Sequence, residues 1–352
     1  MPRKRRTRKT STSFQWSHIL QSQRFRRIAA GLLLLGIVAG ILQFTAPIRL
    51  REPLIWRIPL DKQTRDTHRK QLQALFPWYT IWYWLALFTP LRPGHYELRP
   101  GDNCMHVWNR LRKGLQTPIR FYLRPHRSPG QLAAALGQVL AYDSSTWMAT
   151  FRHFPWEEKG FNSYTWPLLF LPDVYEVYWT ISPQRLIEKM EDNYHRFWNE
   201  ERQKKAYALG LTPIEIGILA SIVEQESYRV SERPLIASVY LNRLRLGMPL
   251  QADPTVIYAW GNFSVNRVTH KMLEIDSPYN TYKRRGLPPG PVGIPSIESI
   301  EAVLNYTPSA YLYFCARPDG SGYHDFSESY QEHLRKARSY QRALERWLAQ
   351  KK

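Results

Sequence analysis

Cysteine is scarce in this sequence: only Cys104 and Cys315 occur among 352 residues. Two cysteines cannot form the dense disulfide framework of a small secreted scaffold, and their spacing does not reveal whether they pair with each other. Isolated cysteines are most often small buried apolar residues, and this is what we expect of both.

Several sequence motifs of metal- and nucleotide-dependent enzymes are also absent. The chain has no H-E-x-x-H, no paired C-x-x-C, no G-x-S-x-G and no G-x-x-x-x-G-K-[ST] pattern. It also has no internal repeat and no long low-complexity tract. We therefore expect neither a metal site nor a cofactor.

Acidic residues are missing from the first 46 positions, although nine Lys or Arg lie among the first 27. Residues 28–46 follow as 19 uncharged residues, close to the roughly 20 that cross a bilayer. A cleaved signal peptide is the alternative, but its apolar core is usually about 7–15 residues long, and no clear A-x-A site follows here. We expect a transmembrane helix at residues 28–46, a basic cytoplasmic tail at residues 1–27, and the remainder outside the cytoplasm.

The net charge of +20 would by itself suggest a nucleic-acid partner. Nine of the 49 basic residues belong to the tail, so the rest of the chain has 40 basic and 29 acidic residues. On the outer side of a membrane we expect no nucleic acid, and an anionic polymer or the lipid surface fits the charge better.

A short α+β pattern follows the apolar segment. The aromatic stretch Phe76–Phe88 is too short to span a membrane and predicts a core helix, or one lying against the membrane interface. The sequence HYEL at 95–98 alternates like a strand, the next helix stops at Gly114, and Ile119–Leu123 is a second strand. This strand–helix–strand unit resembles the LysM-like subdomain of some cell-wall enzymes, and a generic α+β module fits the pattern equally well. Beyond residue 124 the pattern is mainly helical, with an aromatic loop at Phe170–Trp179 that we expect to be structural.

The segment LTPIEIGILASIVEQES predicts a buried helix. Thr212 at the N-cap, Pro213 at the first helical position and Glu215 three residues after the cap form a capping box. Apolar residues cover most sides of the helix, which is typical of a buried one. Its last turns nevertheless carry Glu224 and Glu226, although carboxylates are disfavoured near the negative end of a helix.

Glu224 is the predicted general acid. Its side of the helix is lined by Gly217, Ala220 and Ser221, which leave either a groove for a ligand or a site of close packing. A carboxyl group in apolar surroundings at a helix C-terminus tends to keep its proton, and cleavage of a glycosidic bond requires such an acid. Glu226 lies about 200° from Glu224 around the helix axis, so the two carboxylates cannot both contact one substrate. For Glu226 we expect an ion pair with Arg229.

A second helix is predicted to start at a Ser231 cap and to end at Gly247. The loop after it brings Gln251, Asp253 and Thr255 together on irregular backbone, a suitable place to bind sugar hydroxyls. Asp253 could equally cap a short helix that starts at Pro254.

Long stretches in fixed order carry a specific resemblance. Residues 219–261, 277–314 and the GYHDF sequence at 322–326 are similar to the YceG-like family of endolytic murein transglycosylases. The resemblance implies Glu224, the first Glu of the IVE-x-E motif, as the catalytic residue. It also implies a substrate groove lined by the Gln251–Asp253 loop and the segment Tyr279–Tyr282. Together with Thr255 from the loop pattern, the candidate substrate-binding residues are Gln251, Asp253, Thr255, Tyr279, Asn280 and Tyr282.

The chain departs from the family pattern at two places. Ser227–Tyr228 replace a common Thr-Ala pair, and Ile294–Ser296 replace an N-P-G tripeptide. Ser296 could instead cap the helix that follows. His324 in GYHDF is either a structural residue or a contact in the groove.

The expected fold class is α+β, with a single N-terminal transmembrane helix, a small LysM-like subdomain at 47–123 and a mainly helical YceG-like catalytic domain with a small sheet at 124–352. The resemblance implies an inner-membrane enzyme that cuts the bond between N-acetylmuramic acid and N-acetylglucosamine in nascent peptidoglycan strands. A 1,6-anhydro-muramyl end would form and strand elongation would be limited. Expected partners are the glycan strands, the membrane and cell-wall synthases. A hydrolytic muramidase using Glu224 and Asp253, and a non-catalytic membrane-tethered glycan-binding scaffold, are the alternatives.

Overall fold

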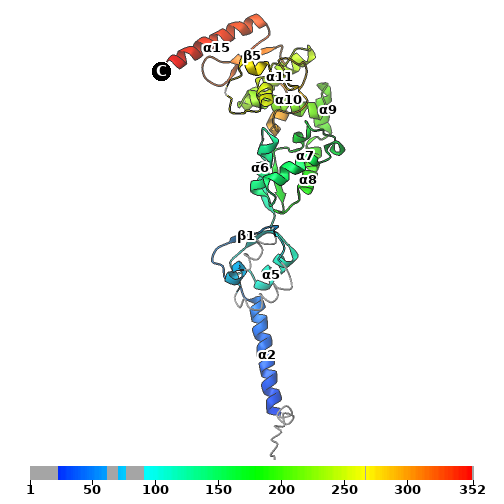
Figure 1. Cartoon of the computed structure of the whole chain (residues 1–352), viewed down its shortest axis with the longest axis vertical. Coiled ribbons are helices and arrows are strands. Elements are labelled where there is room, and N and C mark those ends of the chain that lie inside the picture. Colours follow the sequence, from blue (N-terminus) through cyan, green and yellow to red (C-terminus); the bar gives the residue numbers. More distant parts are fainter. Residues whose placement is uncertain (1–22, 62–69, 77–90, 266, 351–352) are drawn as a thin grey trace, which may run out of the picture. The chain divides into compact units, whose positions relative to one another are not determined.

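The computed structural model describes residues 23–61, 70–76, 91–265 and 267–350, which are coloured in Figure 1. The chain forms two compact units, Met1–Thr117 and Pro118–Lys352. Each unit has its own hydrophobic core. The division of the chain into a LysM-like and a YceG-like domain stays a prediction.

The N-terminal apolar segment forms α2 (Gln23–Thr45), which starts five residues earlier than expected from the sequence. None of its residues is buried, although Phe44 near its end packs against the core of the first unit, and the helix is long and apolar enough to cross a membrane. Helices α9 (Glu200–Ala208) and α10 (Pro213–Glu226) pass the same test only as a pair bent by 76°. Most of α10 is buried in the protein, as in an ordinary core helix. Most of the predicted cytoplasmic tail lies outside the described residues.

The first unit contains one antiparallel pair of strands and a helix. Strand β1 (Leu54–Ile58) pairs with β2 (Gly94–Leu98), and α5 (Cys104–Lys113) ends at Gly114 in a left-handed conformation with φ of 74°. The predicted strand at 95–98 and the predicted end of the helix are therefore confirmed. Of the predicted aromatic helix Phe76–Phe88, all but Phe76 lies outside the described residues.

The predicted strand–helix–strand unit is wrong in one respect. Strand β3 (Ile119–Tyr122) belongs to the second unit, where it pairs with β4 (Val174–Val177) in an antiparallel register. Strand β2 instead takes β1 as its partner. The stretch Phe170–Trp179 therefore contains a strand rather than only a loop, although Phe170 and Tyr175 are buried as expected. The LysM-like assignment is not confirmed.

The first half of the second unit is an aromatic helical layer. It comprises α6 (Pro129–Val139), α7 (Ser144–His153) and α8 (Pro183–Phe197), together with two short 3-10 helices, η1 (Trp156–Lys159) and η2 (Trp166–Leu169). Stacked and edge-on rings fill the space between them: Phe151, Trp156, Trp166 and Phe170.

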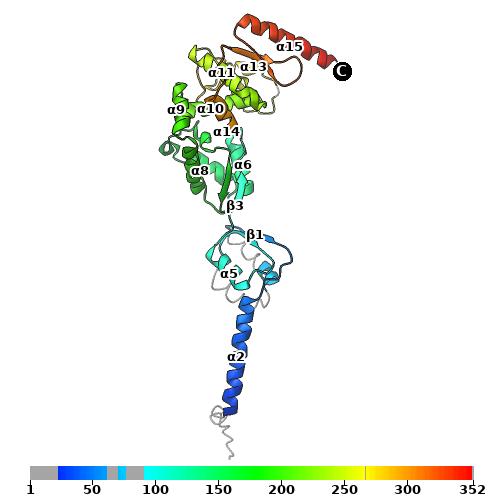
Figure 2. The same cartoon turned by 180° about the vertical axis from the view of Figure 1, so that it is seen from behind.

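Helix α10 runs through the core of the second half. The capping box predicted at Thr212 and Glu215 is present in both directions. Helices α11 (Arg233–Arg245) and α14 (Ile297–Leu304) pack against it, and Figure 2 shows α14 next to α10. Ser231 does not cap α11, because it lies within a 3-10 turn, η3 (Val230–Glu232), that leads directly into that helix. The predicted Ser296 cap is confirmed: its hydroxyl accepts the backbone N–H of Ser299.

The remaining elements are short helices and a hairpin. Helices α12 (Asp253–Trp260) and α13 (His270–Leu273) precede the long loop to α14. Strands β5 (Tyr313–Ala316) and β6 (His324–Ser327) form an antiparallel hairpin, and α15 (Tyr330–Gln350) runs beside β5 (Figure 1). The described residues thus form a mixed fold, mainly helical with three two-stranded sheets. Cys104 is buried, Cys315 is half-buried, and both thiols are free.

Candidate active site

The small-residue side of α10 is a site of close packing. A Cβ atom at Gly217 would lie 2.9 Å from the side chain of Leu168, and Ala220 is fully buried. The hydroxyl of Ser221 accepts the backbone N–H of Val292 at 3.0 Å. Of the two possibilities that the sequence left open, these contacts select packing over a ligand groove.

Glu224 lies at the end of this packed side. One of its carboxylate oxygens accepts the backbone N–H of Ser296 at 2.5 Å. Ser296 is the N-cap of α14, so the contact joins the end of α10 to the start of α14, where the helix dipole favours negative charge. In the described part of the chain Glu224 does not line the cavity that contains the other candidate residues.

Glu226 is the carboxylate that faces that cavity. Its Oε1 accepts a hydrogen bond of 2.5 Å from the hydroxyl of Tyr240 on α11. The ion pair expected with Arg229 does not form among the described residues. The Arg229 guanidinium donates instead to the backbone oxygen of Ser321, at 2.8 Å.

The surroundings of Glu226 favour its protonated form. The pKa of this carboxyl group is raised from 4.5 to about 7, mainly by burial and also by the negative charge of Asp253. The hydrogen bond from Tyr240 and the positive charge of Arg243 oppose this rise. A carboxyl group that titrates near neutral pH can both donate and accept a proton under physiological conditions.

The cavity has a volume of about 340 Å³, within the range of about 300–1,000 Å³ that is usual for small-molecule sites. Four parts of the second unit form its wall: the end of α10, one side of α11, the segment from 250 to 282, and the hairpin with α15. The lining residues are Glu226, Tyr240, Arg243, Leu250, Gln251, Asp253, Tyr282, Phe314 and His333.

Two of the three predicted residues at 251–255 lie on the cavity wall. Gln251 has a left-handed backbone, with φ of 51°, and its side chain accepts a hydrogen bond from Arg243. Asp253 does not cap α12, since the N-cap is Ala252, and its carboxylate accepts the Tyr282 hydroxyl at 2.5 Å. Thr255 has no exposed surface, and its hydroxyl bonds the backbone oxygen of Ala252. The prediction of Thr255 as a substrate contact is therefore corrected to a structural role.

Of the three residues predicted in the segment Tyr279–Tyr282, one lines the cavity and two do not. Tyr282 lines the cavity and holds Asp253. Asn280 is fully buried, and its amide donates to the backbone oxygens of Leu273 and Ile275, so its predicted contact with substrate is also corrected. Tyr279 is 7% exposed and packs on Tyr258, with ring centroids 4.7 Å apart, away from the cavity wall.

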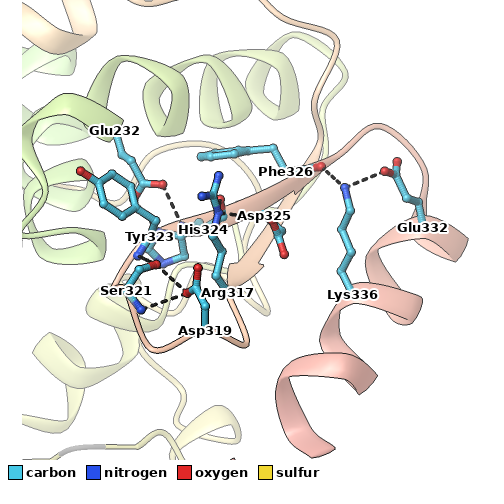
Figure 3. Close-up of polar contacts among 10 residues, drawn as sticks. All are labelled: Glu232, Arg317, Asp319, Ser321, Tyr323, His324, Asp325, Phe326, Glu332 and Lys336. Atoms are coloured by element: carbon cyan, nitrogen blue, oxygen red, sulfur yellow. Dashed lines mark hydrogen bonds and ion pairs between the residues drawn. The ribbon is translucent and has the colours of Figure 1, made fainter. Parts of the chain in front are cut away.

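The structure assigns His324 a structural role. Its Nδ1 lies 2.9 Å from a carboxylate oxygen of Glu232, and its backbone N–H donates to the other oxygen at 2.8 Å (Figure 3). Both side chains are largely buried. On the other side of the hairpin, Lys336 of α15 bonds the backbone oxygen of Phe326. These contacts hold in place the hairpin whose Phe314 closes one side of the cavity.

Besides Glu226, for which an ion pair was expected, sequence reasoning missed five cavity residues: Tyr240, Arg243, Leu250, Phe314 and His333. Tyr240 lies on the buried apolar stripe of α11, where a tyrosine hydroxyl is a sign of a polar partner. Arg243 offered a similar sign, as a charged residue next to that stripe. Among the described residues, no group of three or more His, Cys, Asp or Glu is arranged to hold a metal ion.

Comparisons with known proteins agree on one family. A model described as the YceG-like family matches residues 62–339. A protein of Bacillus subtilis (strain 168) named endolytic murein transglycosylase is 40% identical over 152 residues, which cover 43% of this chain and 40% of the relative. A protein of the same name from Streptococcus pneumoniae serotype 2 is 37% identical over 153 residues, or 41% of this chain and 27% of the relative. The chain thus spans less than half the length of these curated relatives.

A solved structure is similar over a larger part of the chain. The crystal structure at 2.6 Å of a YceG-like protein from Listeria monocytogenes superposes with a TM-score of 0.53 and 26% sequence identity. The match covers 81% of this chain and 99% of the Listeria chain.

Proposed function

The chain belongs to the YceG-like family, and from that premise we propose that it is an endolytic lytic transglycosylase of peptidoglycan. The relatives named endolytic murein transglycosylase support this activity, and the family model spans the residues that line the cavity. Glycan strands are the proposed substrate. The bond that is cut joins N-acetylmuramic acid to N-acetylglucosamine.

We assign the acid to Glu226 rather than to Glu224. Glu226 opens into the cavity and has a pKa raised to about 7, whereas Glu224 is bonded to the start of α14. This single contrast carries the proposal, because a general acid must reach the glycosidic oxygen while it still holds its proton. Asp253, Gln251 and Tyr282 surround the same space and are the proposed sugar contacts.

The proposed reaction needs only one carboxyl group. Protonated Glu226 gives its proton to the glycosidic oxygen, the bond from that oxygen to C1 of the muramyl residue breaks, and the Glu226 carboxylate then removes the proton of the C6 hydroxyl. The C6 oxygen bonds to C1 and closes the 1,6-anhydro ring, which returns Glu226 to its protonated state. Attack within one sugar is favoured by its high effective concentration.

The proposed location is the inner membrane, with α2 as a single-pass anchor and the second unit outside the cytoplasm. The apolar α2 supports the anchor, and the basic residues before and at its start support the orientation. Cutting near the membrane would limit the elongation of nascent strands and would bring the protein close to cell-wall synthases.

Product analysis tests the proposal directly. The full chain, purified in detergent, is incubated with isolated glycan strands, and new strand ends are identified by mass spectrometry. We expect 1,6-anhydro-muramyl ends from the wild type and none from Glu226→Gln. Anhydro ends in undiminished amount from Glu226→Gln would contradict the assignment.

Two other outcomes would replace the proposed function. Reducing muramyl ends would indicate a hydrolytic muramidase, for which Asp253 on the same cavity wall would activate water. No new ends from a folded protein that still binds strands would indicate a glycan-binding scaffold.

A further inference from the structure

Arg243 is a buried cation whose protein partners are all uncharged. The residue is 7% exposed. Its Nε donates to the backbone oxygen of Leu312 at 2.7 Å, and its Nη1 donates to the backbone oxygens of Pro249 and Leu250 at 3.2 and 2.9 Å. No carboxylate in the described part of the chain forms an ion pair with it.

One nitrogen of this guanidinium is left for a ligand. Besides its backbone contacts, Nη1 meets the side-chain oxygen of Gln251 at 3.3 Å. Nη2 makes no hydrogen bond to a described residue, and Arg243 lines the cavity that contains Glu226. Because burying an unpaired charge is costly, such an arrangement suits a site completed by an anion.

No ion pair among the described residues of the cavity wall neutralises this positive charge, although it interacts through space with Glu226. His333 lines the same cavity, and burial and the charge of Arg243 both lower the pKa of its imidazole, which favours the neutral form. The Asp253 carboxylate is bonded to Tyr282. The cavity therefore offers one cation, one anion and a carboxyl group, Glu226, that is close to its pKa at neutral pH.

A muramyl residue matches this arrangement, because it carries a lactyl substituent on O3 that N-acetylglucosamine lacks. In a bare strand the lactyl group ends in a carboxylate, and in a peptide-bearing strand the attached peptide supplies carboxylates instead. We propose that Arg243 binds a carboxylate of the muramyl substituent and thereby selects which sugar of the alternating strand lies next to Glu226. The inference rests on the proposed function and adds to it the means by which the enzyme chooses between two alternating bonds.

Matched substrates test the inference. Bare strands, peptide-bearing strands, and bare strands whose lactyl carboxyl has been converted to the amide are compared by initial rates of formation of anhydro ends, with the full-length enzyme. A charged hydrogen bond contributes about 1.5–3 kcal/mol, so we expect the wild type to prefer bare strands over their amides by about 10- to 150-fold. A preference for peptide-bearing strands over bare strands would identify the peptide as the source of the carboxylate.

Two substitutions on the same helix separate the charge of Arg243 from general effects. Arg243→Gln is expected to bring the ratio of rates for carboxylate and amide substrates close to one. Arg245→Gln removes the same charge from an exposed position whose guanidinium bonds Tyr306 outside the cavity, and it should keep the wild-type ratio. The ratio is measured within each preparation, so partial unfolding of a variant does not affect it.

Arg243→Lys is a second substitution of the same residue, and it decides the test if Arg243→Gln is too unstable to assay. Lysine keeps the charge but loses the planar fork, so an intermediate ratio is expected. A wild-type enzyme that forms anhydro ends without preferring the carboxylate substrates would overturn the inference and leave the proposed function intact. A wild-type ratio in Arg243→Lys or Arg243→Gln would overturn it as well. If the wild type forms no anhydro ends at all, the proposed function fails and the inference fails with it.

Discussion

Glu224 and Glu226 stand two residues apart on α10 and end in different surroundings. Glu224 continues a side of the helix that is packed through Gly217 and Ser221, and it closes that side by bonding the start of α14. Glu226 points into a cavity, where a tyrosine hydroxyl is its partner. The comparison shows that two neighbouring carboxylates of one helix can differ in their surroundings: one fixes a neighbouring helix, and the other faces a cavity, where we propose that it acts as the acid.

The largest expected effect is the difference in reaction rate between the Glu226→Gln and Glu224→Gln variants. We expect Glu226→Gln to lower kcat/KM by about 10²- to 10⁴-fold, the usual contribution of a general acid. Glu224→Gln should stay within about tenfold of the wild type, because it affects only the hydrogen bond to Ser296. Initial rates of formation of anhydro ends measure both variants, and the reverse order would make Glu224 the acid.

A second prediction concerns the packed side alone. Ser221→Ala leaves the buried N–H of Val292 without its acceptor, and we expect the free energy of unfolding to fall by about 1–3 kcal/mol. Ser144→Ala, at an exposed position at the start of α7, should change it by less than about 0.5 kcal/mol. Denaturant titration measures both variants. Equal stabilities would mean that this side of α10 is not tightly packed.

The smallest expected effect is a shift in a pH profile. Tyr240 donates a hydrogen bond that favours the ionised form of Glu226, so Tyr240→Phe should raise the pKa of that carboxyl group above its present value of about 7. An acid acts only while protonated, and activity therefore falls as pH rises through this pKa. Removing a hydrogen bond of about 1 kcal/mol should move the fall upward by about 0.5–1 pH unit.

The pH dependence of kcat/KM measures this shift, with Tyr306→Phe as the control. The Tyr306 hydroxyl bonds Arg245 away from the cavity, and its loss should leave the profile unchanged. An unmoved or lowered profile in Tyr240→Phe would count against Glu226 as the titrating acid.

Local features of the fold could be predicted from the sequence. The start of α10 depends on Thr212, Pro213 and Glu215, and the start of α14 depends on Ser296, all of which act on the backbone within a few residues. The end of α5 depends on Gly114, which takes a left-handed conformation. The same reasoning failed at Ser231, because the chain makes a 3-10 turn there before α11 begins.

The features that could not be predicted depend on residues far apart in the chain. Strand β3 pairs with β4 more than 50 residues later, so the pattern around Ile119 contained no sign of its partner. Glu226 likewise faces a cavity whose far wall contains Phe314 and His333. From the sequence, an arginine three residues after Glu226 was the nearest visible partner, and only the positions of β5 and α15 show the cavity that Glu226 faces. Thr255 and Asn280 show the same limit, since the polarity of a residue does not reveal whether it is exposed.

Gln251 has a consequence for protein engineering. A side chain in the left-handed region costs roughly 1–2 kcal/mol, which glycine would avoid, and Gln251 adopts this conformation at the mouth of the cavity. Selection for heat resistance alone should therefore favour Gln251→Gly. If the proposed strand cleavage uses this residue, selection that also requires cleavage should retain the amide. The two experiments together would measure how much thermal stability the protein loses at this one position.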